Sequence, residues 1–175
     1  MAKVYDLIEA RTVASATHTV TLSSIPQTYT DLLVRFSLRS DFGFNFHEGQ
    51  FTFNSVSSGY SQILFSADGS NPSTAGPQSG QTIATWSLVI NGSASTSNTF
   101  SNGELYIPNY SSTTLGKTWS TTAVAENNAT AGGSWMVAGN NTSTAAISSL
   151  TFYAWQSFIN FVPGSTFYLY GIKNS

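Results

Sequence analysis

Two histidines are the side chains of this sequence that could supply the general base of a hydrolase triad. Such a triad needs a serine, a histidine and a carboxylate that converge in space. His18 alternates in phase with Val20 and Leu22, which favours a partly buried structural role. His47 precedes Glu48 in a segment with no recognisable nucleophile or oxyanion loop. The sequence therefore predicts no catalytic residue.

The carboxylates could support two further kinds of chemistry, and neither pattern is complete. A glycosidase needs two carboxyl groups across a cleft, and the spacing does not select the pair Asp41 and Glu48 over others. Residues 68–71, Asp-Gly-Ser-Asn, resemble half of a calcium-binding loop but lack its terminal bidentate glutamate. An ordinary turn is the favoured interpretation, and we predict no metal and no cofactor.

Two arginines, Arg35 and Arg39, share the outward side of the most regular alternating segment, with Asp31 at its other end. A solvent-facing ladder of cross-strand ion pairs would account for them. Docking on a neighbouring protein would account for them equally, because arginine binds carboxylates through two parallel hydrogen bonds. Both interpretations stay open at this point.

Aromatic side chains mark two candidate contact surfaces. Phe42, Phe44 and Phe46 lie in the Gly-containing segment 41–49, which we expect to be a loop that acts as a lid or a contact surface. A second set occupies outward positions of predicted strands, namely Tyr106, Tyr153, Trp155, Tyr168 and Tyr170. Exposed aromatic clusters on a β-surface mark contact with a protein partner or a carbohydrate.

The composition limits the class of partner. Only 8% of the residues are charged while 14% are aromatic, so Ser, Thr, Asn, Gln and Gly must provide the solubility. A net charge of −2 and six scattered basic residues give no basic patch for nucleic acid or an anionic membrane. No cysteine is present, which excludes disulfides, thiolate catalysis and Cys-type zinc sites. We expect no membrane span and no secretory leader.

Hydrophobic alternation predicts an all-β fold. Leu32, Val34, Phe36 and Leu38 recur at a period of two and should point into the core. About ten such short strands, separated by Gly, Asn or Ser/Thr turns, are typical of an antiparallel β-sandwich with jelly-roll connections. We expect residues 1–175 to form one such domain, in which residues 1–12 are an edge strand or an arm that lies on a neighbour. The turn-rich segment 66–82 is expected to be a surface loop.

The last strand is expected to be a central one. Pro163 and Gly164 suit a tight turn, and residues 167–172 then alternate at the strand period. This pattern places Leu169 in the core.

Five segments in register resemble small virion structural proteins of tailed bacteriophages and prophages, which are tail or capsid decoration proteins. The segments are SIPQTYTDL at 24–32, LRSD at 38–41, NGELYIPNY at 102–110, ENNATA at 126–131 and the closing stretch 161–172. Where relatives usually have a strand of small residues after the arginine-containing one, this chain has the phenylalanine segment.

The resemblance implies a non-enzymatic phage particle component, in the first place a capsid decoration or cement protein that binds the particle surface. Its implied partners are the major capsid or tail protein and further copies of itself in a homo-oligomer such as a trimer. It would be made in the cytoplasm of the bacterial host and leave the cell within the virion. The side chains that we expect to contact partners are Arg35, Arg39, Phe42, Phe44, Phe46, Tyr106, Tyr168 and Tyr170.

The alternative is a tail-fibre tip or adhesin domain that binds glycans of the host surface. In that case the aromatic side chains of residues 42–46 would stack on sugar rings while Asn and Gln side chains bind hydroxyl groups.

Overall fold

The computed structural model describes residues 4–67, 72–126 and 132–173, and these ranges contain twelve β-strands and no helix. The strands are β1 (Tyr5–Thr12), β2 (Thr19–Leu22), β3 (Asp31–Leu38), β4 (Phe46–Phe53), β5 (Tyr60–Ala67), β6 (Pro72–Gln81), β7 (Ala84–Asn91), β8 (Ser101–Ile107), β9 (Lys117–Glu126), β10 (Gly132–Asn141), β11 (Leu150–Tyr153) and β12 (Thr166–Ile172). In the described part of the chain no helix is long and apolar enough to cross a membrane.

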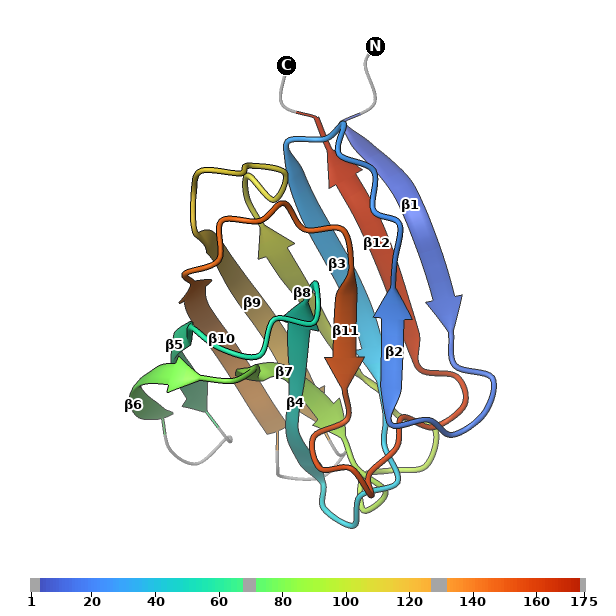
Figure 1. The fold of residues 1–175 in the computed structure, drawn as a ribbon. Helices are drawn as coiled ribbons and strands as arrows, with labels where there is room; N and C mark the ends of the chain where they lie inside the picture. The colour runs from blue at the N-terminus through green and yellow to red at the C-terminus, as the bar shows by residue number, and fades with distance from the viewer. Residues whose placement is uncertain (1–3, 68–71, 127–131, 174–175) are drawn as a thin grey trace.

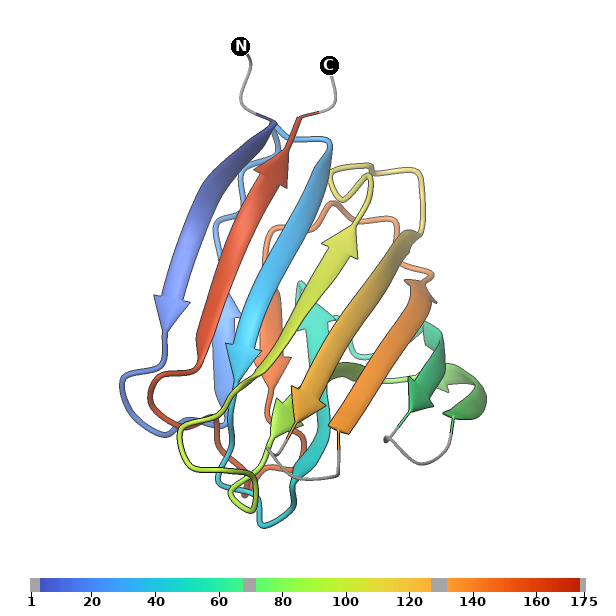
Figure 2. The ribbon, with the colours of Figure 1, turned by 180° about the vertical axis from the view of Figure 1, so that it is seen from behind.

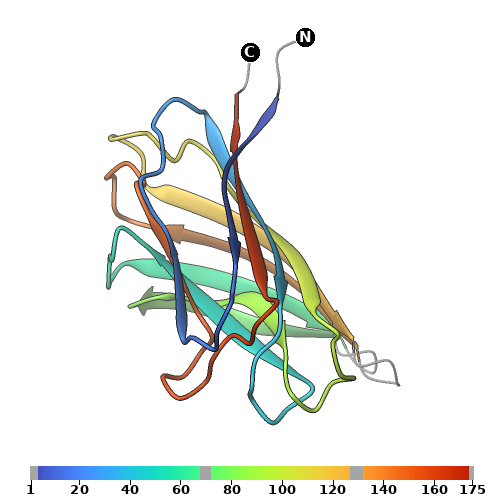
Figure 3. The same cartoon turned by 90° about the vertical axis from the view of Figure 1, so that its right-hand side faces the viewer.

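The strands form two antiparallel sheets of unequal size. The large sheet has eight strands in the order β1-β12-β3-β8-β9-β10-β5-β6, and the small sheet has four in the order β2-β11-β4-β7. The small sheet lies in front in Figure 1, the large sheet lies in front in Figure 2, and Figure 3 shows the two layers from the side. The predicted all-β sandwich is confirmed.

The strands pair in a nested order along the chain. The first strand pairs with the last, β1 with β12, and the second pairs with the last but one, β2 with β11. Inside these, β3 pairs with β8 and β4 pairs with β7. Because β12 also pairs with β3, the last strand lies between two neighbours. The prediction of a central last strand is therefore confirmed.

The core fills the space between the two sheets. Leu32, Val34, Phe36 and Leu38 of β3 are buried, as their alternation predicts. Aromatic rings meet across the layers: Phe152 of the small sheet stacks on Phe167 of the large sheet at 4.8 Å between centroids. Such contacts give the interior the packing on which the stability of a sandwich depends.

Two glycines make room for core rings. A Cβ atom on Gly103 would lie 2.3 Å from the ring of Phe36, and one on Gly139 would lie 2.2 Å from the ring of Trp119. Each ring therefore lies across the backbone of a neighbouring strand where only glycine leaves the space.

Two predictions about the middle of the chain are wrong. The segment 66–82 is not one loop, because β6 occupies most of it and pairs with β5. Its lack of hydrophobic alternation is explained by its position at the sheet edge, where main-chain hydrogen bonds hold the strand and proline is tolerated. Likewise, His47 and Glu48 lie in β4, not in a loop. The calcium-like residues 68–71 lie outside the described part of the chain.

The N-terminal segment is an edge strand of its own chain. Tyr5 of β1 pairs with Ile172 of β12, and the pairing continues to Thr12 with one register shift between Leu7 and Glu9. Of the two interpretations for residues 1–12, the edge strand is confirmed for the described residues.

Leu169→Ala should lower the free energy of unfolding by about 2–5 kcal/mol, because Leu169 is completely buried between the sheets and the substitution leaves a cavity. The same substitution at the exposed Leu115 is the control and should change it by less than about 0.5 kcal/mol. Urea unfolding followed by tryptophan fluorescence measures both variants. Equal effects at the two leucines would contradict the strand assignment.

Candidate functional site

The outer face of the large sheet is the face turned away from the small sheet, and it carries a continuous row of side chains. Direct cross-strand pairs join the row from strand to strand. Its members are Tyr168 of β12, Arg35 of β3, Glu104 of β8, Thr122 of β9, Met136 of β10 and Phe65 of β5. Directly opposed residues of antiparallel strands point to the same side, so these side chains share one surface.

Large apolar side chains on this outer face are exposed. Tyr5, Leu7, Phe65, Val124 and Met136 each expose between 48% and 57% of their surface. In the neighbouring row Leu7 pairs with Tyr170, Tyr170 with Leu33, and Leu33 with Tyr106. Exposed apolar side chains gathered on one sheet face make this face the candidate interaction site.

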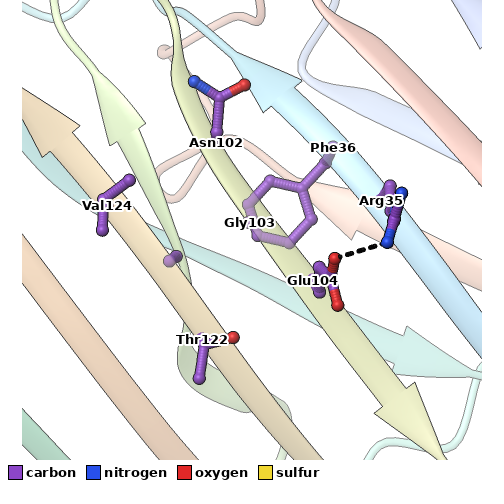
Figure 4. Close-up of a pocket in the computed structure, with 8 residues that line it drawn as sticks. Arg35, Phe36, Asn102, Gly103, Glu104, Thr122 and Val124 are labelled. Atoms are coloured by element: carbon purple, nitrogen blue, oxygen red, sulfur yellow. Dashed lines mark ion pairs between the residues drawn. The ribbon is translucent and has the colours of Figure 1, made fainter.

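An ion pair lies in the middle of the outer face. The Nη2 atom of Arg35 is 3.0 Å from Oε1 of Glu104, and both side chains remain about half exposed. The pair borders a shallow hollow of about 420 Å³ over β3, β8 and β9, which Asn102, Thr122 and Val124 also line (Figure 4). An exposed pair of this kind contributes at most about 1 kcal/mol to stability.

Tyr106 belongs to the outer face, but its hydroxyl group is already engaged. It donates a hydrogen bond of 2.7 Å to Asp31, which also accepts one of 2.9 Å from the Asn109 backbone N–H. The bond to Asp31 raises the pKa of Tyr106 to about 12. Asp31 lies on the outer side of β3 as its alternation predicts, but it is buried and hydrogen-bonded to Tyr106 and Asn109, so the prediction that it faces solvent is wrong.

Arg39 does not belong to the outer face. Its guanidinium donates to the backbone oxygens of four residues in the loop between β7 and β8, at distances of 2.7–3.4 Å. These residues are Ser93, Ser95, Thr96 and Thr99. Arg39 lies just beyond the end of β3, and its guanidinium is engaged by this loop of its own chain.

The three phenylalanines of the segment 41–49 have different environments. Phe42 and Phe46 are partly buried and pack on the core, and Phe46 covers Gly133. Phe44 is exposed and stacks on Phe42, with 4.9 Å between the ring centroids. This segment lies on a different surface from Arg35, so the predicted contact residues fall into two groups.

A serine and a histidine meet beside this segment. The hydroxyl of Ser40 lies 2.6 Å from Nε2 of His47, and Nδ1 of His47 lies 2.8 Å from the backbone oxygen of Glu48. A carbonyl can only accept, so Nδ1 carries the proton and Nε2 accepts from Ser40. Ser40 is completely buried and also lies against the Asn91 carbonyl, so a substrate cannot reach its hydroxyl in this structure.

Glu48 lies next to this pair between two indole rings. Burial raises the pKa of Glu48 to about 7, although the indole N–H groups of Trp155 and Trp86 favour its charged form. Both tryptophans have positive φ, 53° and 86°, which is uncommon for bulky residues. Burial lowers the pKa of His47 to about 4. The two groups thus hold their neutral forms over much of the weakly acidic range.

His18 has the structural role that its alternation predicts. It is partly buried, and its Nδ1 donates to the backbone oxygen of Ile159 at 2.9 Å. Among the described residues no group of three or more His, Cys, Asp or Glu side chains could hold a metal ion.

The structure therefore brings together Arg35, Tyr106, Tyr168 and Tyr170, and it adds members that sequence reasoning missed. These are Leu7, Phe65, Glu104, Val124 and Met136 on the outer face. Alternation places each on one side of its strand, but only the strand order unites them. A search of protein-family models and a search of curated proteins both returned no match to this chain.

Glu48→Gln and His47→Gln should change the pH dependence of stability in opposite directions. The folded state retains the Glu48 proton between its ordinary pKa of 4.5 and about 7, so this contribution to stability is complete below pH 4.5 and is lost as pH rises. The unfolded state binds the His47 proton below pH 6.5 while the folded state does so only near 4, so this contribution is lost as pH falls. Between pH 4.5 and 6.5 the two effects oppose each other.

In Glu48→Gln the free energy of unfolding should therefore fall, relative to wild type, as pH drops from 6.5 to 4.5. In His47→Gln it should rise over the same interval. Urea titrations at several pH values measure both, and profiles parallel to that of wild type would contradict the burial of these groups.

Proposed function

We propose that this protein is a non-enzymatic structural protein of a bacteriophage particle, a decoration protein that binds to the particle surface as part of an assembly. The observation that carries this proposal is the outer face of the large sheet. Tyr5, Leu7, Val124 and Met136 leave about half of their surface exposed to solvent on this one sheet face. Covering such a face by another protein releases water from apolar surface, which favours assembly.

The strand order supports the same proposal. The strands β1, β12, β3 and β8 of one sheet face β2, β11, β4 and β7 of the other, and each strand pairs with its counterpart from the opposite end of the chain. This nested order supports a jelly-roll connectivity, to which β5, β6, β9 and β10 add strands at one side. Jelly rolls are common in viral capsid proteins and in lectins.

Phage particles that lack this protein should lose stability, and particles that carry it should display it on the head. Heating of the two kinds of particle, with release of DNA as the readout, tests the first expectation, and cryo-electron microscopy tests the second. Addition of the purified protein to deficient particles should restore their heat resistance. A position away from the head, or equal stability of the two kinds of particle, would refute decoration.

The second candidate function is an adhesin that binds glycans of the host surface, and the exposed Phe44 favours it. Phe44 stacks on Phe42, and the ring of Trp155 lies 5.4 Å from that of Phe42, so an aromatic surface faces solvent at the end of the sandwich. Sugar rings bind to such surfaces through their apolar C–H faces.

Phe44→Ser should abolish glycan binding if the second candidate is correct, while Phe65→Ser, at an exposed phenylalanine on the outer face, should leave it intact. A glycan array followed by titration of any hit measures the difference. An array without any hit would remove this candidate and leave the first.

A further inference from the structure

We infer that the outer face of the large sheet is covered by the same face of a second copy, related by a two-fold axis that runs along the strands between β3 and β8. The inference rests on the proposed function and extends it, because it names a second copy of this chain as the first partner in the assembly. It follows from the charges, the apolar side chains and the edges of the large sheet.

The charge arrangement on the outer face is self-complementary. Arg35 on β3 and Glu104 on β8 are direct cross-strand neighbours, 3.0 Å apart in one chain. A two-fold axis between these strands places Arg35 of one copy opposite Glu104 of the other, and the reverse. Four charges then alternate in sign around the axis, as an isologous interface requires.

The same axis brings apolar side chains together. It places β12 opposite β9 and β1 opposite β10, because these strands lie at equal distances on either side of the axis. Because each cross-strand row keeps its level, Leu7 of one copy then faces Ala138 of the other, and Met136 faces Ala10. The rings of Tyr168 and Tyr170 lie over the small side chains of Thr122 and Ser120. Aromatic and methionine side chains are the types that interface cores favour.

The area available is sufficient for a dimer. Six strands, from β1 to β10, overlap in this arrangement. At about 4.8 Å between strands and about seven residues of 3.3 Å each, they give a flat footprint of about 650 Å². The side chains add relief, which brings the buried surface near the roughly 800 Å² per partner of a standard interface.

Two copies could also join by pairing strands at the edges of their large sheets, but the edge strands β1 and β6 disfavour such pairing. On β1 the register shifts between Leu7 and Glu9, and Glu9 forms an ion pair with Arg11. On β6 the prolines Pro72 and Pro77 interrupt the main-chain donors. Bulges, charges and prolines protect sheet edges from pairing, so face-to-face packing is the favoured contact.

The test is the mass of the purified full-length protein in solution, measured by light scattering and analytical ultracentrifugation over a hundredfold range of concentration. Wild type should have twice the chain mass of 18.7 kDa. Met136→Lys and Val124→Lys should be monomers that remain folded, since both side chains are exposed. Phe44→Lys and Phe158→Lys, at exposed positions away from the outer face, are the controls and should remain dimers.

A charge exchange distinguishes contact across the axis from an effect within one chain. Arg35→Glu and Glu104→Arg should each weaken dimerisation at least tenfold, because like charges then face each other. An equimolar mixture of the two single variants should form a heterodimer as stable as the wild-type dimer, because opposite charges then meet only across the axis while each chain carries two like charges. A wild-type monomer at all concentrations, a trimer, or a dimer unaffected by Met136→Lys would overturn the inference.

The results separate this inference from the proposed function. A dimer in solution that never occurs on phage particles would refute decoration and leave the dimer. A monomer that binds to the particle shell through the outer face would refute the dimer and leave decoration.

Discussion

The nested pairing of the strands is the constraint on which the remainder of this structure depends. The large sheet is incomplete until β12, at the far end of the chain, enters between β1 and β3. Tyr5 pairs with Ile172, so nearly the whole chain lies between two paired residues. Contacts of such sequence separation form late and slowly, because a long loop must close before they contribute. The core therefore assembles as a unit, and Leu169 belongs to its last component.

The strand pairing gives two sheets of unequal size, and it leaves the outer face of the large sheet uncovered. Eight strands of the chain satisfy the nested order, and β5, β6, β9 and β10 all join the large sheet. The small sheet can cover only one face of the large sheet. The other face is broad and nearly uninterrupted, and its exposed Leu7, Val124 and Met136 are its most apolar members.

Sequence alone predicts those features that depend on local alternation. The core positions of β3 and the turn at Pro163 and Gly164 need no knowledge of other strands. The positions of Asp31, Arg39 and Ser40 do, because each is determined by a loop distant in sequence: the turn at Asn109, the loop 93–99 and the neighbourhood of Asn91. The sequence did not predict β6, because main-chain hydrogen bonds hold an edge strand in place and no hydrophobic alternation marks it. The outer face was half predictable, since alternation shows which residues point outward but not which strands are neighbours.

The chain has few charged residues, so the exposed ion pair of Arg35 and Glu104 is a distinctive feature of the outer face. Lys117 is buried, and its ammonium group donates to three backbone oxygens, those of Ser112, Leu115 and Thr144. Arg39 binds backbone oxygens in the same way, so two of the six basic residues hold loops together. The exposed ion pair of Arg35 and Glu104 holds no loop, and in the proposed dimer it fixes how the two sheet faces are oriented.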